Sequence, residues 1–222
     1  MNSNRLLQIS LFIDYNDSVI DVGCDHALLD IYLVQNKLCK KTLACDISSN
    51  ALNQGIENIK KSDLSSFIPT ILSDGLNNID VSDYNTLVIS GMGAHTITDI
   101  LKNKNKLKRI HKIILSSNND YVYLRKKLNR IGYYLEDEKI VFDKNHYYHV
   151  MKFIKSKKKN KRKELKYGYL RISNIPYYEN YITHNNEIKK MLKKHWIKKI
   201  GLTIDNHYYQ KYIKKITGKK IR

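Results

Sequence analysis

The sequence predicts an α/β fold, in which a mainly parallel sheet carries helices on both faces and ends in an antiparallel hairpin. Short apolar runs alternate with helical patterns along most of the chain, which is typical of parallel strands joined by crossover helices. Four strands end in small or acidic residues, so these residues should meet at one edge of the sheet. The last two strands have no helix between them and therefore form a hairpin.

The first strand, turn and helix are predicted around residues 19–26. The apolar run leads into Asp21, Gly23 and Asp25, and a helical pattern follows at once. Glycine lets the backbone approach a ligand closely because it has no Cβ. In folds of this kind the ligand lies outside the carboxyl ends of the strands. Only one glycine is present, so a purely structural turn is the alternative to a ligand site.

The other elements follow from hydrophobic spacing and from turn and cap residues. We expect strands over residues 18–23, 41–46, 68–72, 86–90, 110–115, 133–143 and 146–154. We expect helices over residues 2–13, 26–37, 49–61, 94–103, 121–131, 178–200 and 205–217. Ser48 or Ser49 offers an N-cap for the helix over 49–61. A terminal antiparallel strand on such a seven-stranded sheet is characteristic of class I methyltransferases, whereas dinucleotide dehydrogenases close with a sixth parallel strand.

Positive charge is concentrated in the last third of the chain. Residues 1–150 contain 18 Lys/Arg and 17 Asp/Glu, whereas residues 151–222 contain 22 Lys/Arg and 4 Asp/Glu. The two parts therefore carry net charges of +1 and +18. A biased genome composition would affect both parts, so it does not explain the asymmetry. A basic segment joined to a neutral domain indicates a nucleic-acid partner, with a solvated charge run as the alternative.

The charge pattern also predicts where the domains divide. Seven of the nine residues in 155–163 are Lys or Arg, and we interpret them as a basic linker. The expected domains are 1–154, which holds the α/β fold, and 155–222, which is small, basic and helical.

Composition argues against a membrane protein and against a metal site. No apolar run is long enough to cross a membrane, and the N-terminus lacks the features of a secretory signal. Cys24, Cys39 and Cys45 have neither metal-ligand nor disulfide spacing, and an odd number of cysteines fits a reducing compartment. We therefore expect a cytoplasmic protein without a metal.

Acids at the first two strand ends are candidates for ligand binding. Asp21 could brace the turn or hold the amino-acid part of a ligand, and a surface acid is the alternative. Asp46 follows the second strand at the place where an acid usually binds ribose hydroxyls, and a helix N-cap is the alternative.

The third and fourth strand ends add two more candidates. Asp74 could accept a hydrogen bond from an adenine amino group, or it could be a turn residue beside Gly75. Gly91-Met92-Gly93 would allow close backbone approach to a planar substrate, or it could simply begin a helix.

These motifs resemble those of the TrmK-type tRNA (adenine-N1)-methyltransferases. The similar residues are 21–27 (Asp-Val-Gly-Cys-Asp-His-Ala), Asp74-Gly75-Leu76, Gly91-Met92-Gly93, Asn118, Leu124-Arg125 and Leu128. Residues 144–150, with their paired tyrosines, are also similar, and the resemblance covers about residues 5–200. The family usually has Gln-Pro-Asn where this chain has Ser116-Ser117-Asn118, and serine where it has Cys24.

The resemblance implies a class I Rossmann-like methyltransferase with a small C-terminal helical domain. It implies S-adenosyl-L-methionine as cofactor and methylation of the N1 nitrogen of adenine at position 22 of bacterial tRNA. We expect Asp25 to be the catalytic base, because it follows the turn glycine at the mouth of the crevice. Domain 1–154 would then be catalytic, and domain 155–222 would bind tRNA.

The remaining predicted contacts divide into two sets. The cofactor would contact Asp21, Gly23, Cys24, His26, Asp46, Ile47, Asp74, Gly75 and Gly91. The RNA substrate would contact Gly91, Met92, Gly93, Asn118, Lys190, Lys194 and Lys198. We expect a monomer whose macromolecular partner is tRNA.

Two other functions stay open at this stage. One is methylation of another substrate, such as rRNA, although the basic C-terminal part disfavours a small molecule. The other is a non-catalytic RNA-binding protein built on a methyltransferase fold. The set of Asp21, Gly23, Asp46 and Asp74 disfavours the second.

Overall fold

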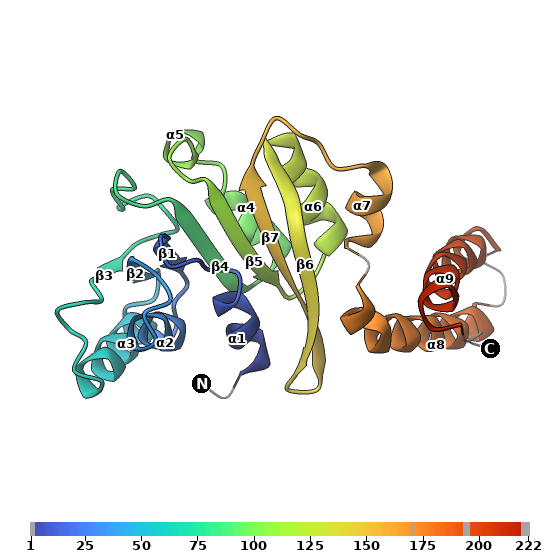
Figure 1. Cartoon of the computed structure of the whole chain (residues 1–222), viewed down its shortest axis with the longest axis horizontal. Coiled ribbons are helices and arrows are strands. Elements are labelled where there is room, and N and C mark those ends of the chain that lie inside the picture. The colour runs from blue at the N-terminus through green and yellow to red at the C-terminus, as the bar shows by residue number, and fades with distance from the viewer. Residues whose placement is uncertain (1–2, 170, 193–195, 219–222) are drawn as a thin grey trace. The chain divides into compact units, whose positions relative to one another are not determined.

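The computed structural model describes residues 3–169, 171–192 and 196–218, and Figure 1 shows the elements along the chain. The chain divides into two compact units, Met1–Gly168 and Tyr169–Arg222. The expected domain boundary after residue 154 lies earlier in the chain than this division.

The first unit contains one seven-stranded sheet. Its strands are β1 (Ser18–Val22), β2 (Lys41–Asp46), β3 (Thr70–Leu72), β4 (Thr86–Met92), β5 (Lys112–Ser117), β6 (Tyr133–Asp143) and β7 (His146–Lys155). They lie in the order β3-β2-β1-β4-β5-β7-β6, and only the pairs that involve β7 are antiparallel. The predicted parallel sheet with a terminal antiparallel hairpin is therefore confirmed. The strand order reverses between β1 and β4, so their carboxyl ends flank the crevice where ligands bind in such sheets.

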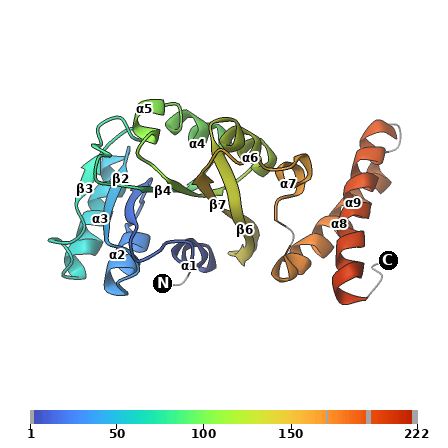
Figure 2. The ribbon, with the colours of Figure 1, turned by 45° about the horizontal axis from the view of Figure 1, so that its top comes forward.

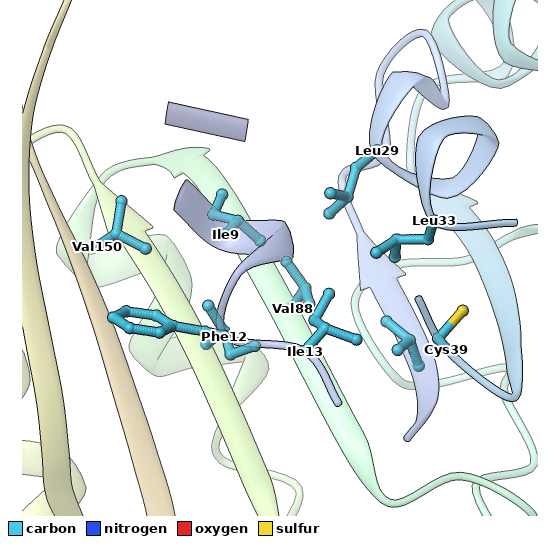
Figure 3. Close-up of a cluster of buried hydrophobic side chains, with 10 residues drawn as sticks. Ile9, Phe12, Ile13, Leu29, Leu33, Cys39, Val88 and Val150 are labelled. Atoms are coloured by element: carbon cyan, nitrogen blue, oxygen red, sulfur yellow. The ribbon is translucent and has the colours of Figure 1, made fainter. Parts of the chain in front are cut away.

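Helices cover both faces of this sheet. They are α1 (Asn4–Ser10), α2 (Leu28–Gln35), α3 (Ser49–Lys61), α4 (Ala94–Ile100), α5 (Lys104–Leu107), α6 (Tyr121–Arg130) and α7 (Arg162–Tyr167). Figure 2 shows α1, α2 and α3 on one side of the sheet and α4 and α6 on the other. The core under α1 and α2 contains Ile9 and Leu33 packed with Val88 of β4 and Val150 of β7 (Figure 3). This packing fixes the N-terminal helix α1 against the centre of the sheet.

Local sequence explains several boundaries. Ser48 caps α3 by accepting a hydrogen bond from the backbone N–H of Ala51, so the helix begins where it was predicted. Lys144 and Asn145 both have positive φ, as a two-residue hairpin turn between β6 and β7 requires. The predicted helix over 94–103 was too long, because α4 ends at Ile100 and α5 starts separately at Lys104.

Residues 155–163 are not a free linker, so this prediction was wrong. The side chain of Asn160 is buried and contacts both the backbone N–H and the carbonyl of Leu135, over 2.8 and 3.1 Å. These contacts lie beside the register shift in β6 between Leu135 and Asp137, and they give the backbone of this edge strand side-chain hydrogen-bond partners. The lysine-rich segment therefore follows the edge of the sheet before α7.

The second unit is a helical hairpin. Its elements are η1 (Ile172–Asn174), α8 (Ile175–Met191) and α9 (Trp196–Thr217). Tyr178 of α8 stacks on Tyr209 of α9 at 4.7 Å between ring centroids, and Asn185 donates a hydrogen bond to Asn206 over 2.8 Å. The predicted division into helices over 178–200 and 205–217 was wrong, because α8 ends at Met191 and α9 already runs through residues 196–217. Within the ranges that the structure covers, no helix combines the length and apolar character needed to span a bilayer.

Candidate active site

A pocket of about 460 Å³ lies at the carboxyl edge of the sheet, where β1, β2, β4 and β5 end. Its lining comprises Arg5, Leu6, Asp21, Gly23, Cys24, Asp25, His26, Leu28, Leu29, Asp46, Ser90, Gly91, Met92, Asn118 and Tyr148. The volume falls in the range of small-molecule sites. The structure therefore brings together most of the predicted ligand contacts from the first unit.

The turn after β1 has an unusual backbone. Gly23, Asp25 and Ala27 all have positive φ, at 77°, 49° and 53°. The two non-glycine residues pay a conformational cost there, and such strain is concentrated at functional sites. A Cβ on Gly23 would lie 2.1 Å from Cε of Met92, so the turn and the end of β4 are in close contact. The two strand ends that flank the crevice thus form one surface.

Asp46 supports this turn directly. One carboxylate oxygen accepts a hydrogen bond from the backbone N–H of Asp25 over 3.2 Å, and the other accepts from the N–H of Ser48 over 2.9 Å. The cap of α3 is Ser48 itself, so the cap alternative for Asp46 is wrong. Asp46 is buried but lines the pocket, and its predicted contact with ribose stays a prediction. A ribose held by Asp46 would therefore be bound by the same carboxylate that holds the backbone of Asp25.

Asp21 is a buried acid and not a surface acid. It lies at the floor of the pocket and shares a hydrogen bond with the carboxyl of Asp30 in α2, which Thr42 also contacts. Burial, followed by the neighbouring charges of Asp30 and Asp46, raises the pKa of Asp21 well above its usual value. Burial also raises the pKa of Asp30, to about 6. No Lys or Arg is among the causes of either shift, and both raised pKa values favour protonation of the pair.

Asp25 and His26 lie at the pocket mouth. Their side chains are 72% and 50% exposed, and His26 Nε2 is 3.6 Å from Oδ1 of Asp25. The main chain of His26 is held in place because Asn58 of α3 donates a hydrogen bond to its carbonyl. Asp25 therefore has a fixed backbone and a carboxylate that is exposed at the pocket.

The ends of β4 and β5 are tied together by hydrogen bonds. The side-chain amide of Asn118 donates to the carbonyl of Gly91 over 2.8 Å, and its backbone N–H donates to the carbonyl of Met92 over 3.0 Å. Asn119 accepts a hydrogen bond from Ala94 at the start of α4, next to Gly93. Gly91 and Met92 lie within β4, which is longer than predicted, so the alternative that they begin a helix is wrong for them. Gly93 is the N-cap of α4.

Other predicted site residues lie elsewhere. Asp74 and Gly75 line a second pocket of about 390 Å³ together with residues of α4, and Ile47 is 67% exposed. Lys190 and Lys198 are exposed residues of α8 and α9 in the second unit, whereas Lys194 lies outside the described residues. Cys24 is buried, and burial raises the pKa of its thiol, which favours the neutral form.

Six lining residues were not predicted as contacts: the apolar Leu6, Leu28 and Leu29, and the polar Arg5, Ser90 and Tyr148. Tyr148 belongs to the tyrosine pair already noted in the hairpin, and that pair was the available signal. Arg5 lies in the first helix without any surrounding motif. Ser90 has a buried hydroxyl oxygen that finds no hydrogen-bond partner among the described residues, although it lines the pocket.

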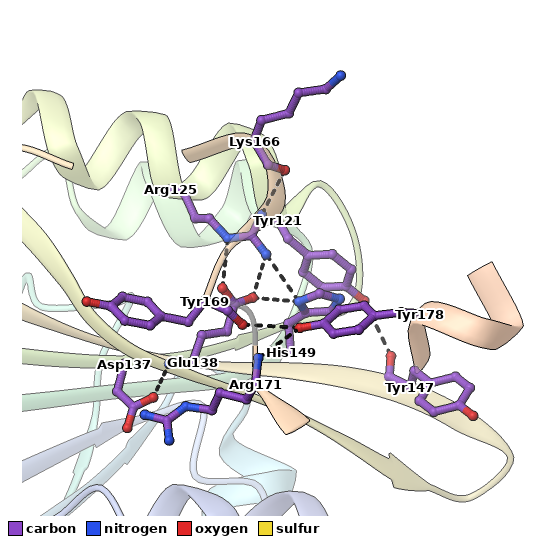
Figure 4. Close-up of polar contacts among 10 residues, drawn as sticks. All are labelled: Tyr121, Arg125, Asp137, Glu138, Tyr147, His149, Lys166, Tyr169, Arg171 and Tyr178. Atoms are coloured by element: carbon purple, nitrogen blue, oxygen red, sulfur yellow. Dashed lines mark hydrogen bonds and ion pairs between the residues drawn. The ribbon is translucent and has the colours of Figure 1, made fainter. Parts of the chain in front are cut away.

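A second cluster of ionisable groups is fully buried under the hairpin (Figure 4). Arg125 contacts both carboxylate oxygens of Glu138, over 3.0 and 2.5 Å, and His149 Nδ1 is 2.6 Å from the same carboxylate. Burial opposes ionisation of Glu138, but Arg125 and His149 lower its pKa to about 2. Tyr121 stacks on His149 at 3.8 Å.

Gly168 closes this cluster. It has a φ of 71°, and a Cβ at this position would lie 2.1 Å from Glu138 Oε2. The chain after α7 therefore passes directly over the ion pair, where another residue type would not fit. Arg125 also donates a hydrogen bond to the carbonyl of Lys166 in α7. The cluster holds α6, the hairpin and α7 together.

Among residues 3–169, 171–192 and 196–218, no group of three or more His, Cys, Asp or Glu side chains is arranged to hold a metal ion. The sheet order, the terminal hairpin and the pocket of acids and glycines at the carboxyl edge define the fold and site of a class I methyltransferase.

Comparison with known proteins agrees with this class. Residues 2–151 match the family model described as a methyltransferase domain. The tRNA (adenine(22)-N(1))-methyltransferase of Bacillus subtilis is 31% identical over 150 residues, which are 67% of this chain and 63% of that protein. The matched region thus spans less than two thirds of this curated relative.

Solved structures give longer matches. M. capricolum TrmK in complex with S-adenosyl-homocysteine is 32% identical, with a TM-score of 0.81 and coverage of 96% of this chain and 98% of that chain. A Streptococcus pneumoniae protein described as a putative tRNA (m1A22) methyltransferase shares the fold at 22% identity, with a TM-score of 0.86 and coverage of 95% and 99%. The chain belongs to the TrmK family of methyltransferases.

Proposed function

We propose that this protein uses S-adenosyl-L-methionine to methylate N1 of adenine 22 in tRNA, in the cytoplasm. The observation that carries the proposal is the pocket at the carboxyl edge, where Asp21, Gly23, Asp25 and Asp46 converge in a chain of the TrmK family. The relatives named above act on, or are described as acting on, this position of tRNA.

The pocket suits this cofactor. Gly23 supplies a turn in which the backbone can approach a ligand, and Asp21 places an acid beside it for a positively charged amino-acid group. The unpartnered hydroxyl of Ser90 adds a hydrogen-bonding group. When bound, S-adenosyl-L-methionine supplies a methyl group on a sulfonium centre. Asp46 is the acid available for ribose hydroxyls.

Asp25 is our candidate for the catalytic base. Adenine N1 is a moderate nucleophile, so much of the enzyme's task is to hold it in a reactive position. Methylation at N1 places positive charge on the purine, and a carboxylate near N6 stabilises that charge and can accept the N6 proton. The side chain of Asp25 is exposed at the pocket mouth, while Asp46 fixes its backbone. General-base assistance of this kind is typically worth about 10²–10⁴-fold in rate.

The strand ends opposite Asp25 are suited to receive the base. Asn118 uses its amide N–H to hold Gly91, and its side-chain oxygen can accept a hydrogen bond from a donor such as the N6 amino group. Gly91 lines the pocket without a side chain of its own, so a flat ligand can approach the backbone there beside the guanidinium of Arg5. A base that is paired or stacked in folded tRNA must be extruded before it reaches such a pocket.

The second unit is our candidate for the RNA-binding region. Residues 169–222, which make up this unit, contain 13 Lys/Arg and 3 Asp/Glu and so carry a net charge of +10, and Lys190 and Lys198 are exposed. Lysine contacts to phosphates supply affinity without reading sequence. This unit would therefore bind the tRNA body, while the pocket selects the adenine.

The decisive assay incubates the full chain with S-adenosyl-L-methionine and a transcribed tRNA that has adenine at position 22. Mass spectrometry of the digested product should show 1-methyladenosine at that position, and a tRNA with guanine 22 should stay unmodified. Methylation of rRNA but not tRNA would favour the other RNA substrate. Absence of cofactor binding by calorimetry would favour a non-catalytic RNA-binding protein.

A charge-reversal variant tests the RNA-binding region. Lys190→Glu with Lys198→Glu should weaken tRNA binding and flatten its salt dependence, because each lost phosphate contact lowers the slope by about one unit. Lys60→Glu with Lys61→Glu in α3 makes the same charge change in the first unit and is the matched control. Equal affinities of the Lys190/Lys198 variant and the parent across a salt series would show that the RNA-binding surface lies elsewhere.

A further inference from the structure

Arg5 and Tyr148 form one wall of the pocket, although they come from opposite ends of the first unit. Arg5 belongs to α1 and Tyr148 to β7, and Arg5 Cζ lies 4.9 Å from the centroid of the tyrosine ring. Both residues line the pocket that holds Asp25 and Asn118. A Cβ built on Gly91 would be 3.5 Å from Nη1 of Arg5, so the guanidinium lies directly over the end of β4.

The backbone around Arg5 is held in place by the tip of the hairpin. Ser3 Oγ donates a hydrogen bond to Oδ2 of Asp143 over 2.6 Å, and the N–H of Arg5 donates to the same oxygen over 3.2 Å. Asn4 donates to the carbonyl of Phe142 over 3.0 Å. These contacts use the backbone of Arg5 and not its guanidinium. The side chain is therefore positioned over the pocket while its charged end stays available.

The guanidinium of Arg5 has no hydrogen bond or ion pair to any residue in the described part of the chain. Among the described residues that line the pocket, Arg5 is the one Lys or Arg. The acids of the lining are Asp21, Asp25 and Asp46, and His26 also lines the pocket. A planar guanidinium presents its N–H donors as a fork that matches two oxygens of a carboxylate or phosphate. The cation–π contact with Tyr148 restricts the position of this guanidinium before any ligand arrives.

We propose that Arg5, whose guanidinium lies over the ring of Tyr148, is an oxyanion-binding residue that fixes a carboxylate or phosphate group of the ligand in this pocket. The inference rests on the proposed function, which offers two sources for that oxyanion. One is the carboxylate of the methionine part of the cofactor, and the other is a backbone phosphate next to the target adenine. The same chemistry binds either one, and binding measurements distinguish them.

The test compares Arg5→Gln with the parent by calorimetry on the full chain. If the oxyanion belongs to the cofactor, affinity for S-adenosyl-homocysteine should fall about 10- to 100-fold, whereas affinity for 5′-methylthioadenosine, which lacks the amino acid, should not change. If it belongs to the RNA, both cofactor affinities should stay constant and the KM for tRNA should rise by a similar factor. Arg5→Lys keeps the charge without the fork and should recover part of the loss in either case.

Two controls make the result specific. Arg109→Gln removes an exposed arginine just before β5, at the edge of the sheet opposite the pocket, and should leave all three quantities unchanged. Tyr148→Phe keeps the ring and should behave like the parent, whereas Tyr148→Leu should lose about two- to fivefold in the affinity that depends on Arg5. Melting temperatures confirm that the variants fold.

The inference is overturned if Arg5→Gln binds S-adenosyl-homocysteine and tRNA as tightly as Arg109→Gln does. In that case Arg5 only packs on Tyr148. Failure of the proposed function would be recognised separately, because the unaltered protein would then bind no S-adenosyl-homocysteine or would leave tRNA unmethylated.

Discussion

The pocket and the hairpin both contain buried acids, but these acids differ in the charge of the side chains around them. Glu138 under the hairpin has a bidentate arginine and a histidine beside it, and its pKa falls to about 2. Asp21 at the pocket floor has Asp30 and Asp46 as its charged neighbours, and its pKa rises. The charge of Glu138 is balanced within the fold by Arg125, whereas burial and two neighbouring acids favour the protonated form of Asp21.

The difference separates a structural role from a functional one. An ion pair that is matched and hydrogen-bonded on all sides can hold several elements together, as Arg125 and Glu138 hold α6, the hairpin and α7. Acids gathered without a cation destabilise a folded chain, and such arrangements are found at sites that bind or react. Three predictions test this comparison.

The largest expected effect is on stability at the matched cluster. Glu138→Gln leaves Arg125 buried without its counter-charge, and removal of one partner of a buried pair costs about 3–5 kcal/mol. Urea unfolding of this variant and of Glu57→Gln, an exposed residue of α3, measures the effect. Equal unfolding free energies for the two variants would mean that the cluster does not hold the hairpin.

A smaller effect is expected at Asp46. Asp46→Ala removes the acceptor for the N–H groups of Asp25 and Ser48, so cofactor affinity should fall about 10- to 100-fold and turnover should fall as well. Asp46→Asn keeps an acceptor oxygen, so its cofactor affinity and turnover should fall less than those of Asp46→Ala. Asp83→Ala, at an exposed acid paired with Lys41, is the control for calorimetry. An Asp46→Ala variant with the parent's affinity and rate would remove Asp46 from the site.

The smallest effect concerns the pH dependence of stability. The pKa of Asp30 is raised from 3.8 to about 6, so the folded state binds more protons than the unfolded state between these values, and stability falls as pH rises through this window. Asp30→Asn cannot ionise. The free energy of unfolding of this variant should therefore rise relative to that of the parent by on the order of 1–2 kcal/mol between about pH 4 and pH 6. Above pH 6 the difference between the two proteins should stay constant.

Melting temperatures over this pH range measure the gain, with Asp63→Asn as an exposed control. A constant difference between Asp30→Asn and the parent from pH 4 to pH 7 would show that the pair does not hold a proton.

Local sequence signals predicted much of the fold. β2 and α3 have the predicted bounds, because a short apolar run that ends at an acid and a serine cap are visible in the sequence itself. The break between α8 and α9 was misplaced, since residues 178–200 read as one continuous helical pattern. The supposed linker was misread because the contact of Asn160 with Leu135 joins segments that are far apart in the chain.

The candidate site shows the same limit. Strand-end residues such as Asp21, Gly23 and Asn118 could be predicted to converge, because the carboxyl ends of parallel strands share an edge. Asp74 lines a different pocket, because the loop after β3 carries it there. The path of that loop could not be predicted from the sequence. Arg5 could not be predicted as a pocket residue, because its position depends on the hydrogen bonds between the start of α1 and the tip of the hairpin.

The central claim is that Asp25 acts in methyl transfer while Glu138 acts in folding. Single-turnover methylation of tRNA by Asp25→Asn and Glu138→Gln, measured on folded protein with saturating S-adenosyl-L-methionine, tests it most directly. Asp25→Asn should lose about 10²–10⁴-fold in rate with its cofactor affinity intact, and Glu138→Gln should react at close to the parental rate per folded molecule. A parental rate for Asp25→Asn, or a comparable loss for folded Glu138→Gln, would contradict the account.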